Sequence, residues 1–84
     1  MHSICITFRS VTVAQRAERT LRGGGVECIL NRTPRWMEER GCGYCLRLRS
    51  QLVQQAVQLL RNNSVAFNKV FAFREKDKVE ELDI

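Results

Sequence analysis

The sequence predicts a small α+β domain in which elements follow the order strand, helix, strand, strand, helix, strand. Two observations support this order. Apolar residues alternate with polar ones in four short segments, which is typical of strands with one buried face. Two segments between them instead have apolar residues spaced three and four apart, which is typical of amphipathic helices. Each half of the chain therefore has the same strand–helix–strand plan.

The first half begins with a predicted strand over residues 4–8, because Ile4, Ile6 and Phe8 alternate with other residue types. Ser10 is suited to cap the helix that follows. Apolar residues at helical spacing then form one face of that helix, namely Val13, Ala14, Ala17 and Leu21. Three glycines at 23–25 are expected to end it.

The second strand is expected over residues 26–30, and Pro34 ends it because proline cannot donate to a strand ladder. Residues 31–43 form the longest irregular stretch, in which a short helical turn after Pro34 is predicted. A third strand follows from Tyr44 to Arg49, and Ser50 is a candidate cap for the second helix. That helix is predicted from residues at the spacing i, i+3, i+4, i+7, which are Val53, Ala56, Val57 and Leu60. A fourth strand is predicted over 65–73.

This order predicts a ferredoxin-like β-α-β-β-α-β sandwich, with a four-stranded antiparallel sheet and two helices on one face. Residues 1–74 are expected to form a single domain. Residues 75–84 are expected to form an acidic C-terminal tail, frayed or in a short helix. The other face of the sheet is expected to be open and to display Cys5, Thr7, Cys45, Arg47 and Arg49.

The chain has 84 residues and a formal net charge of +5. Five acids lie in the segment 75–84 against two lysines, so the rest of the chain is more basic than the whole. A basic body suits an anionic partner, although a solvated surface explains the same charges. No segment predicts a membrane span, and the first residues do not resemble a signal peptide. A cytoplasmic location, where thiols stay reduced, is therefore expected.

The segment Arg40-Gly41-Cys42-Gly43-Tyr44-Cys45 places two thiols three positions apart between glycines and arginines. A thiolate is the reactive form of cysteine, so a site that uses one must favour the anion. Arg35, Arg40 and Arg47 are near enough in sequence to supply positive charge, as is Arg32.

Glycine backbones can also turn their N–H groups toward an anion, which makes Gly41 and Gly43 candidate anion-stabilising residues. The alternative is that this segment is only a turn entering a strand, with cysteine acting as a small apolar residue. A disulfide between the two thiols requires that Cys42 lie in the turn, because a three-residue offset within a strand places side chains on opposite faces.

Two other thiol chemistries are weaker candidates. A thioredoxin-like redox site needs its first thiol at a helix N-terminus, but the residues after Cys45 alternate like a strand. A zinc site usually needs two close cysteine pairs, and this chain has one. Neither a metal nor a cofactor is predicted.

The chain resembles the selenium/sulfur carrier protein-like family over residues 4 to about 73. The matching stretches, in order, are Ile6-Thr7-Phe8-Arg9-Ser10, Ala17-Glu18, Gly25-Val26, Thr33-Pro34-Arg35, Cys42-Gly43 and Leu46-Arg47. The resemblance implies a carrier that holds selenium or sulfur on one cysteine and delivers it to a partner enzyme.

By the family's pattern the carrying thiol is Cys42, which glycine follows. Cys45 departs from that pattern, where the family has a small apolar residue, and is a possible resolving thiol for release through an internal disulfide. The implied partners are proteins that donate and accept sulfur or selenium.

The main alternative is an RNA-binding or protein-interaction module that uses the open basic face of the sheet. RNA recognition on such a sheet uses aromatic side chains, and the predicted outward positions on its middle strands include none. Nucleic acid is therefore a less favoured partner. Self-association through the sheet stays open. No array of catalytic residues suggests an enzyme that acts alone, so a non-catalytic carrier is preferred.

Overall fold

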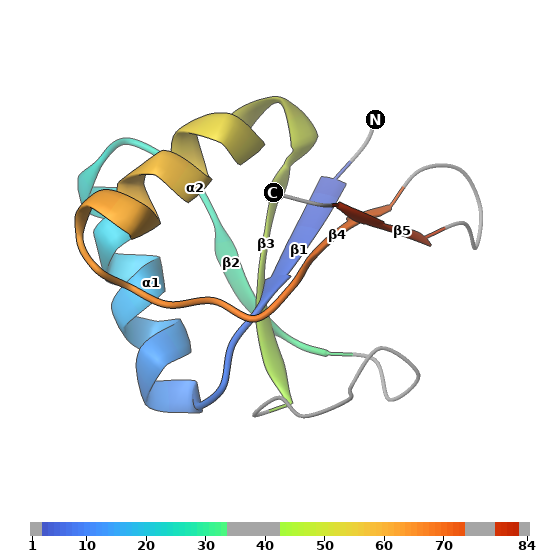
Figure 1. Ribbon diagram of the computed structural model, residues 1–84, viewed down its shortest axis with the longest axis horizontal. Coiled ribbons are helices and arrows are strands. Elements are labelled where there is room, and N and C mark those ends of the chain that lie inside the picture. Colours follow the sequence, from blue (N-terminus) through green and yellow to red (C-terminus); the bar gives the residue numbers. More distant parts are fainter. Residues whose placement is uncertain (1–2, 34–42, 74–78, 83–84) are drawn as a thin grey trace.

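The computed structural model describes residues 3–33, 43–73 and 79–82, and these contain two α-helices and five strands (Figure 1). The elements follow the chain as β1 (Ser3–Thr7), α1 (Val11–Gly23), β2 (Ile29–Arg32), β3 (Tyr44–Arg49), a short 3₁₀ helix η2 (Ser50–Leu52), α2 (Val53–Asn62), β4 (Val70–Phe73) and β5 (Val79–Leu82). The predicted order of the first six main elements is therefore confirmed.

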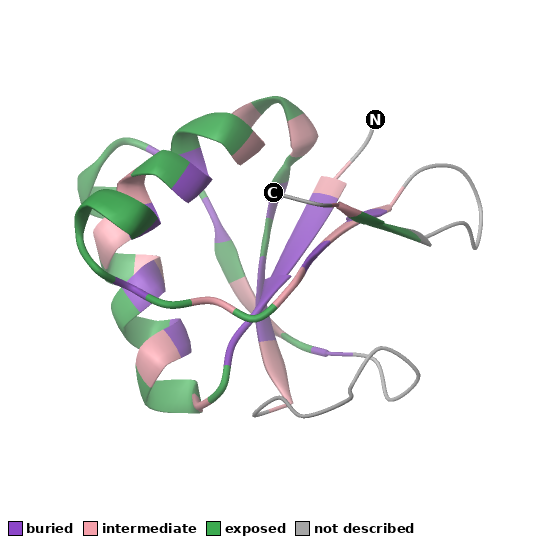
Figure 2. Cartoon of the chain, in the orientation of Figure 1, coloured by how far each residue is buried: buried purple, intermediate pink, exposed green. Residues whose placement is uncertain are grey.

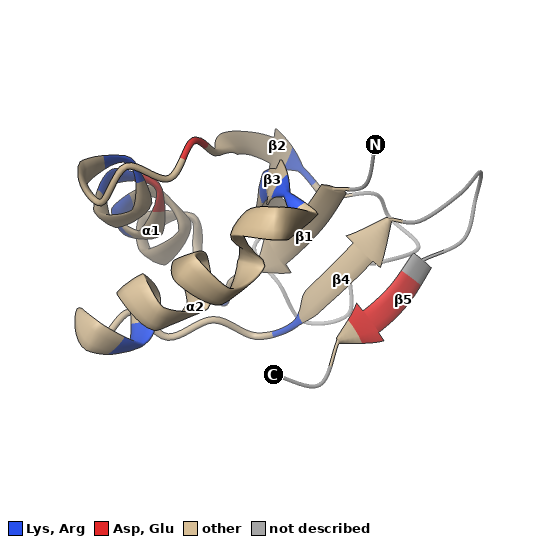
Figure 3. Cartoon of the chain, turned by 90° about the horizontal axis from the view of Figure 1, so that it is seen from above, with Lys and Arg blue, Asp and Glu red and all other residues tan. Residues whose placement is uncertain are grey.

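The strands form one antiparallel sheet in the order β2-β3-β1-β4-β5. Strand β1 pairs with β3 and β4 rather than with β2, so a strand of the second half lies between the two strands of the first half. Both helices lie on the same side of this sheet (Figure 3). The α+β class is confirmed, but the predicted count of four strands is wrong, because β5 adds a fifth.

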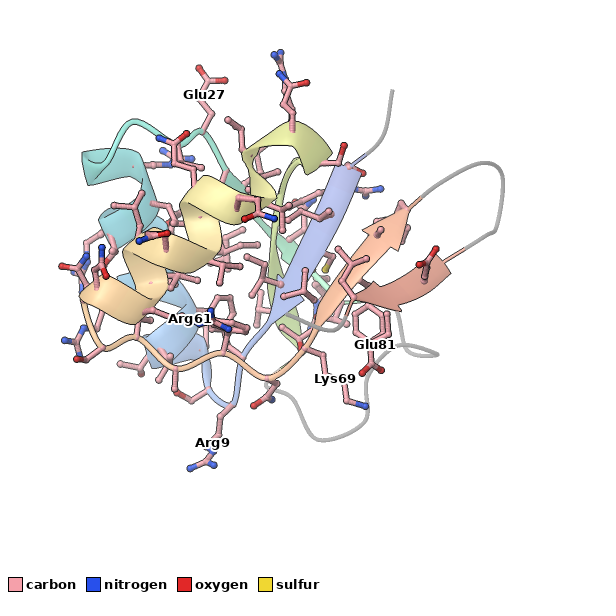
Figure 4. All side chains as sticks on the ribbon, turned by 45° about the horizontal axis from the view of Figure 1, so that its top comes forward. Arg9, Glu27, Arg61, Lys69 and Glu81 are labelled. Atoms are coloured by element: carbon pink, nitrogen blue, oxygen red, sulfur yellow. The ribbon has the colours of Figure 1, made fainter. Side chains whose placement is uncertain are left out.

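Strand β5 lies within the segment 75–84, where no strand was expected. It pairs with β4, placing Glu81 opposite Phe71 and Val79 opposite Phe73. The Lys69 amino group lies 3.6 Å from the carboxylate of Glu81, and the two side chains lie side by side (Figure 4). The acidic sequence of this segment did not suggest a strand, because a central strand would exclude charged residues. A strand at the edge of a sheet tolerates them.

The main core fills the space between the sheet and the helices. Ile4, Ile6 and Phe8 are fully buried there, as the alternation in the first segment predicted (Figure 2). Strand β3 contributes Leu46, while α1 contributes Leu21. Full burial of side chains of this size stabilises a fold by about 1.5–3 kcal/mol each, so these positions hold the helices on the sheet.

Helix α1 begins and ends as expected. The side-chain oxygen of Ser10 accepts a hydrogen bond of 3.2 Å from the backbone N–H of Val13, and Gly24 is the C-cap. Strand β2 starts three residues later than predicted. The carbonyl of Cys28 accepts a hydrogen bond of 2.9 Å from the Arg22 guanidinium. This bond holds the backbone to α1 at the residue before β2 begins and pairs with β3.

Two other boundaries differ from the sequence prediction. Ser50 begins the 3₁₀ helix η2, and the N-cap of α2 is Leu52, which makes no side-chain capping bond. Strand β4 begins at Val70 rather than at residue 65. Neither described helix is long and apolar enough to cross a membrane.

The glycine run at the end of α1 supports a stability test with an internal control. Gly25 has φ of 84°, a left-handed conformation that costs other residues roughly 1–2 kcal/mol. Gly23 lies in the helix, and a methyl group added there would meet nothing within 4 Å. We expect Gly25→Ala to lower the free energy of unfolding by about 1 kcal/mol, and Gly23→Ala to raise it by up to about 1 kcal/mol. Urea denaturation measures both, and changes of the same sign would contradict the assigned conformations.

Candidate functional site

The face of the sheet opposite the helices carries two thiols in contact. Cys5 on β1 and Cys45 on β3 pack together against Phe71 and Phe73 of β4, and we call these four residues the thiol cluster. The strand register explains the contact. Cys5 lies opposite Arg47, while Cys45 lies opposite Thr7, so the two cysteines are diagonal neighbours on adjacent strands.

The two cysteines of the thiol cluster are buried, which corrects the expectation that the face displays them openly. Cys5 is 1% exposed, Cys45 is 2% exposed and Thr7 is 7% exposed. The two phenylalanines of β4 supply the cover, because Phe71 lies directly opposite Cys5 in the pairing of β1 with β4. Arg47 and Arg49 do remain exposed, as expected.

The two thiols have opposite pKa shifts. A hydrogen bond with the Cys5 thiol stabilises the Cys45 anion and, together with the Thr33 hydroxyl and the positive charge of Arg47, lowers the pKa of Cys45 to about 7, although burial acts in the other direction. The same hydrogen bond and burial raise the pKa of Cys5 well above its ordinary value. Of the two thiols, Cys45 is therefore the one that forms a thiolate more readily, while the Cys5 thiol keeps its proton.

Arg47 is held over the cluster by two contacts. Its guanidinium carbon lies 4.5 Å from the centre of the Phe73 ring, a cation–π arrangement. Its Nε donates a hydrogen bond of 3.4 Å to the hydroxyl of Ser3. This predicted anion-stabilising residue is thus positioned beside the cysteines, and its charge favours the thiolate of Cys45.

A pocket with a volume of about 240 Å³ opens beside the two sulfurs. Its lining residues are Cys5, Asn31, Arg32, Cys45, Arg47 and Phe73. The pocket therefore combines a thiolate, two arginines and an amide in a space suited to a small ligand rather than a folded partner.

The β2–β3 connection is tied at its ends. The backbone N–H of Thr33 donates a hydrogen bond of 2.8 Å to the carbonyl of Gly43. Gly43 has φ of 83°, so the chain turns there before β3 begins at Tyr44. Predicted site residues Arg35, Arg40, Gly41 and Cys42 lie outside the described residues. Of the predicted set, the structure therefore brings together Cys45 and Arg47, and places Gly43 two residues before Cys45.

Cys28 belongs to a different environment. It is buried at 4% exposure in the main core, on the helix side of the sheet. Its sulfur lies 4.0 Å from the carbonyl oxygen of Glu18, and burial raises the pKa of its thiol. Cys28 therefore serves as a matched buried cysteine without a thiol partner among the described residues.

Sequence reasoning missed Cys5 as a partner of Cys45 and missed the phenylalanines that cover both. The alternation in each strand did place Cys5 and Cys45 on the same face, but the register between strands was needed to bring them into contact. Phe71 and Phe73 also place aromatic rings on this face, on β4 and not on the two strands whose outward positions were expected to lack them.

These features define a small α+β protein with a buried thiolate site on its sheet. A family model described as Putative Se/S carrier protein-like matches residues 3–72. The chain belongs to this family, as its sequence suggested. No curated protein and no solved structure matches the chain.

The role of Arg47 can be tested by thiol titration. We expect Arg47→Gln to raise the pKa of Cys45 by about half a unit, because an exposed guanidinium is partly screened by water. Arg49→Gln is the matched control, since Arg49 is exposed on the same strand but does not contribute to the Cys45 shift. The ultraviolet absorbance of the thiolate against pH, in a Cys42→Ser background, measures the midpoint. An unchanged midpoint in Arg47→Gln would contradict an electrostatic effect of Arg47 on the Cys45 thiol.

Proposed function

We propose that this protein carries sulfur or selenium as a persulfide or selenide on a reactive cysteine and delivers it to a partner enzyme. Membership of the Putative Se/S carrier protein-like family supports the transfer of sulfur or selenium as the chemistry. The single observation that carries the proposal is the environment of Cys45, in which a thiol, a hydroxyl and a guanidinium all stabilise a sulfur anion. A carrier needs such an environment because the thiolate is the form that accepts a chalcogen atom.

Cys42 is proposed as the carrying thiol. The family pattern marks it through the glycine that follows, and covalent connection places it next to Gly43, whose carbonyl is bonded to Thr33. A disulfide with Cys45 requires that Cys42 lie outside the alternation of β3, whose described residues begin at Tyr44, because a three-residue offset within a strand places side chains on opposite faces. Arg35, Arg40, Gly41 and Gly43 are proposed to stabilise the anion on Cys42, as Arg47 does for Cys45.

Transfer requires no net oxidation. The Cys42 thiolate attacks the terminal sulfur of a donor persulfide, the donor's S–S bond breaks as the new one forms, and the donor leaves as a thiolate. Cys45 offers a route of release. Its thiolate attacks the inner sulfur of the Cys42 persulfide, forms a Cys42–Cys45 disulfide and expels hydrosulfide, so the protein is oxidised and the carried sulfur is reduced. The proposed donors and acceptors are enzymes of chalcogen metabolism, with a cysteine desulfurase as the testable donor class.

The proposal predicts that a cysteine desulfurase with free cysteine adds one sulfur atom to Cys42. Cys42→Ser should remove the adduct made by this protein donor, because the buried Cys45 is out of a protein's reach. Cys28→Ser is the control and should load normally. Intact-protein and peptide mass spectrometry locate the adduct, and parallel loading with selenite tests selenium. If Cys42→Ser still gains one sulfur atom at another exposed position, the labelling is adventitious and the assignment of Cys42 is contradicted.

A second candidate, an RNA-binding or protein-interaction module, gains support from Phe71 and Phe73, which lie on the face opposite the helices. Figure 3 shows basic residues on β2 and β3 and acidic residues on β5, so only one end of the sheet suits an anionic partner. Arg47 already covers the Phe73 ring, which reduces the surface available for stacking a base.

This candidate predicts that the protein binds single-stranded RNA. The double variant Arg47→Glu, Arg49→Glu should lose this binding, because both arginines are exposed at the basic end of the sheet. Fluorescence anisotropy with a labelled oligonucleotide at physiological salt measures the binding. Binding that ignores sequence and falls steeply with added salt would show only the net charge of +5 and would not support specific RNA recognition.

A further inference from the structure

We propose that Cys45 is a second, interior chalcogen site that accepts a single sulfur atom from a small persulfide or polysulfide, with Cys5 as the residue that positions the site and donates a hydrogen bond to it. This inference rests on the proposed function, since it takes chalcogen transfer as the chemistry of the protein. It assigns the Cys45 sulfur as the acceptor atom, small persulfides and polysulfides as the donors, and a positioning role to Cys5.

The first support is the space next to the sulfur. The pocket of about 240 Å³ is lined by Cys5 and Cys45, so an atom added to Cys45 has room without displacing the packed rings. Arg47 and Asn31 line the same pocket and offer N–H groups to an added anion. Cys28 also lines a pocket, which it shares with Arg22, but it has no thiol beside it among the described residues and burial raises the pKa of its thiol.

The second support is the diagonal register of Cys5 and Cys45. Diagonal neighbours on an antiparallel pair have Cα atoms roughly 7–8 Å apart. A disulfide usually needs about 4.4–6.8 Å, so a direct bond between these sulfurs would require the backbone to move. The pair is therefore arranged to form a hydrogen bond and to hold an added atom, rather than to close a disulfide with each other.

The third support is the limited access. Cys45 is 2% exposed and is covered by Phe71 and Phe73, so a sulfur on another protein cannot reach it without opening the sheet. A low-molecular-weight persulfide or inorganic polysulfide can enter through the pocket. The same cover keeps thiols of other proteins from the loaded atom, which suits storage of a reactive chalcogen.

The transfer balances without an external oxidant or reductant. The Cys45 thiolate attacks the terminal sulfur of the polysulfide, the S–S bond to that atom breaks, and the shortened polysulfide leaves with the electron pair. The transferred atom keeps its oxidation state and is bound as Cys45–S–S⁻. Cys5 keeps its proton throughout and donates its hydrogen bond to the loaded group.

The groups that face Cys45 from each neighbouring described element define the expected pH dependence. They are Cys5 and Thr7 from β1, Arg47 from β3, Asn31 from β2 and Thr33 directly after β2, while Phe71 and Phe73 of β4 contribute phenyl rings. Arg32 of β2 also lines the pocket, but its guanidinium carbon lies 5.5 Å from the centre of the Tyr44 ring. Among them Cys5 makes the largest contribution to the lowered pKa of Cys45, ahead of Thr33 and Arg47. Removing Cys5 should therefore move the pH profile of loading more than removing either of the others.

The test uses the full chain with Cys42→Ser and Cys28→Ser, which leaves Cys5 and Cys45. Inorganic polysulfide is added across a pH range, the excess is removed, and intact and peptide mass spectrometry follow the added sulfur. We expect one sulfur atom on Cys45, with a rate that rises through a midpoint near pH 7. A chain that keeps only Cys28 is the matched control and should take up none.

Cys5→Ala in this background should shift the midpoint upward to about 8.5 or beyond, the ordinary range of a thiol. At pH 7 the thiolate fraction would fall roughly 15-fold, while the more basic thiolate reacts about fivefold faster, so the net rate falls only about threefold. The midpoint is therefore the deciding measurement. Cys5→Ser, whose hydroxyl can also donate, should move it less. Thr33→Val gives a second comparison if Cys5→Ala does not fold, and should produce a smaller upward shift.

Three outcomes overturn the inference: no sulfur on Cys45, sulfur on Cys5 instead, or midpoints that do not move in Cys5→Ala or Thr33→Val. The desulfurase experiment on the unmodified chain separates this failure from that of the proposed function. Loading of Cys42 by the desulfurase, with no loading of Cys45 by polysulfide, removes only the interior site. Loading of Cys45 by polysulfide, with no loading of Cys42 by the desulfurase, supports the interior site and removes Cys42 as the carrying thiol.

Discussion

The antiparallel register between β1 and β3 is the constraint on which the site depends. It sets Cys5 opposite Arg47 and Thr7 opposite Cys45, which brings one cysteine from each strand into diagonal contact. Because side chains alternate between the two faces of a strand, a shift of one residue would send Cys45 into the main core and turn Leu46 out. Burial of Ile4 and Ile6 beneath the helices therefore fixes the thiol site on the other face. Packing on one side of the sheet determines chemistry on the other.

The alternation of apolar residues was sufficient to predict most of the fold. It placed β1, β3 and both helices, and it put Cys5, Cys45 and Arg47 on one face. The errors lie where tertiary contacts override local pattern. Strand β2 starts late because Arg22 binds the carbonyl of Cys28, and β5 forms because the edge of β4 is available to pair. No local pattern in an acidic segment reveals that edge.

The site was predicted in part for a related reason. Charged residues, glycines and thiols are visible in the segment around Cys42, so Arg47 was predicted from the sequence as an anion-stabilising residue. Cys5 lies forty residues before Cys45, and only the strand register shows that they meet. The cover by Phe71 and Phe73 depends on the pairing of β4 with β1, which is equally remote in sequence. An expected open face thus becomes a pair of buried cysteines with a small pocket.

Burial of the two thiols changes which chemistry the face can support. A docking surface needs exposed groups, whereas Cys5 and Cys45 are almost fully buried, with Arg47 and Arg49 exposed on the same strand as Cys45. Burial disfavours a thiolate at Cys45, and the hydrogen bonds from Cys5 and Thr33 together with the charge of Arg47 offset this desolvation cost. If Cys45 served only to fill the space, a small apolar residue would do so without that cost. The added thiol and the donors arranged around it favour a site that acts on a sulfur or selenium atom over one that only completes the packing.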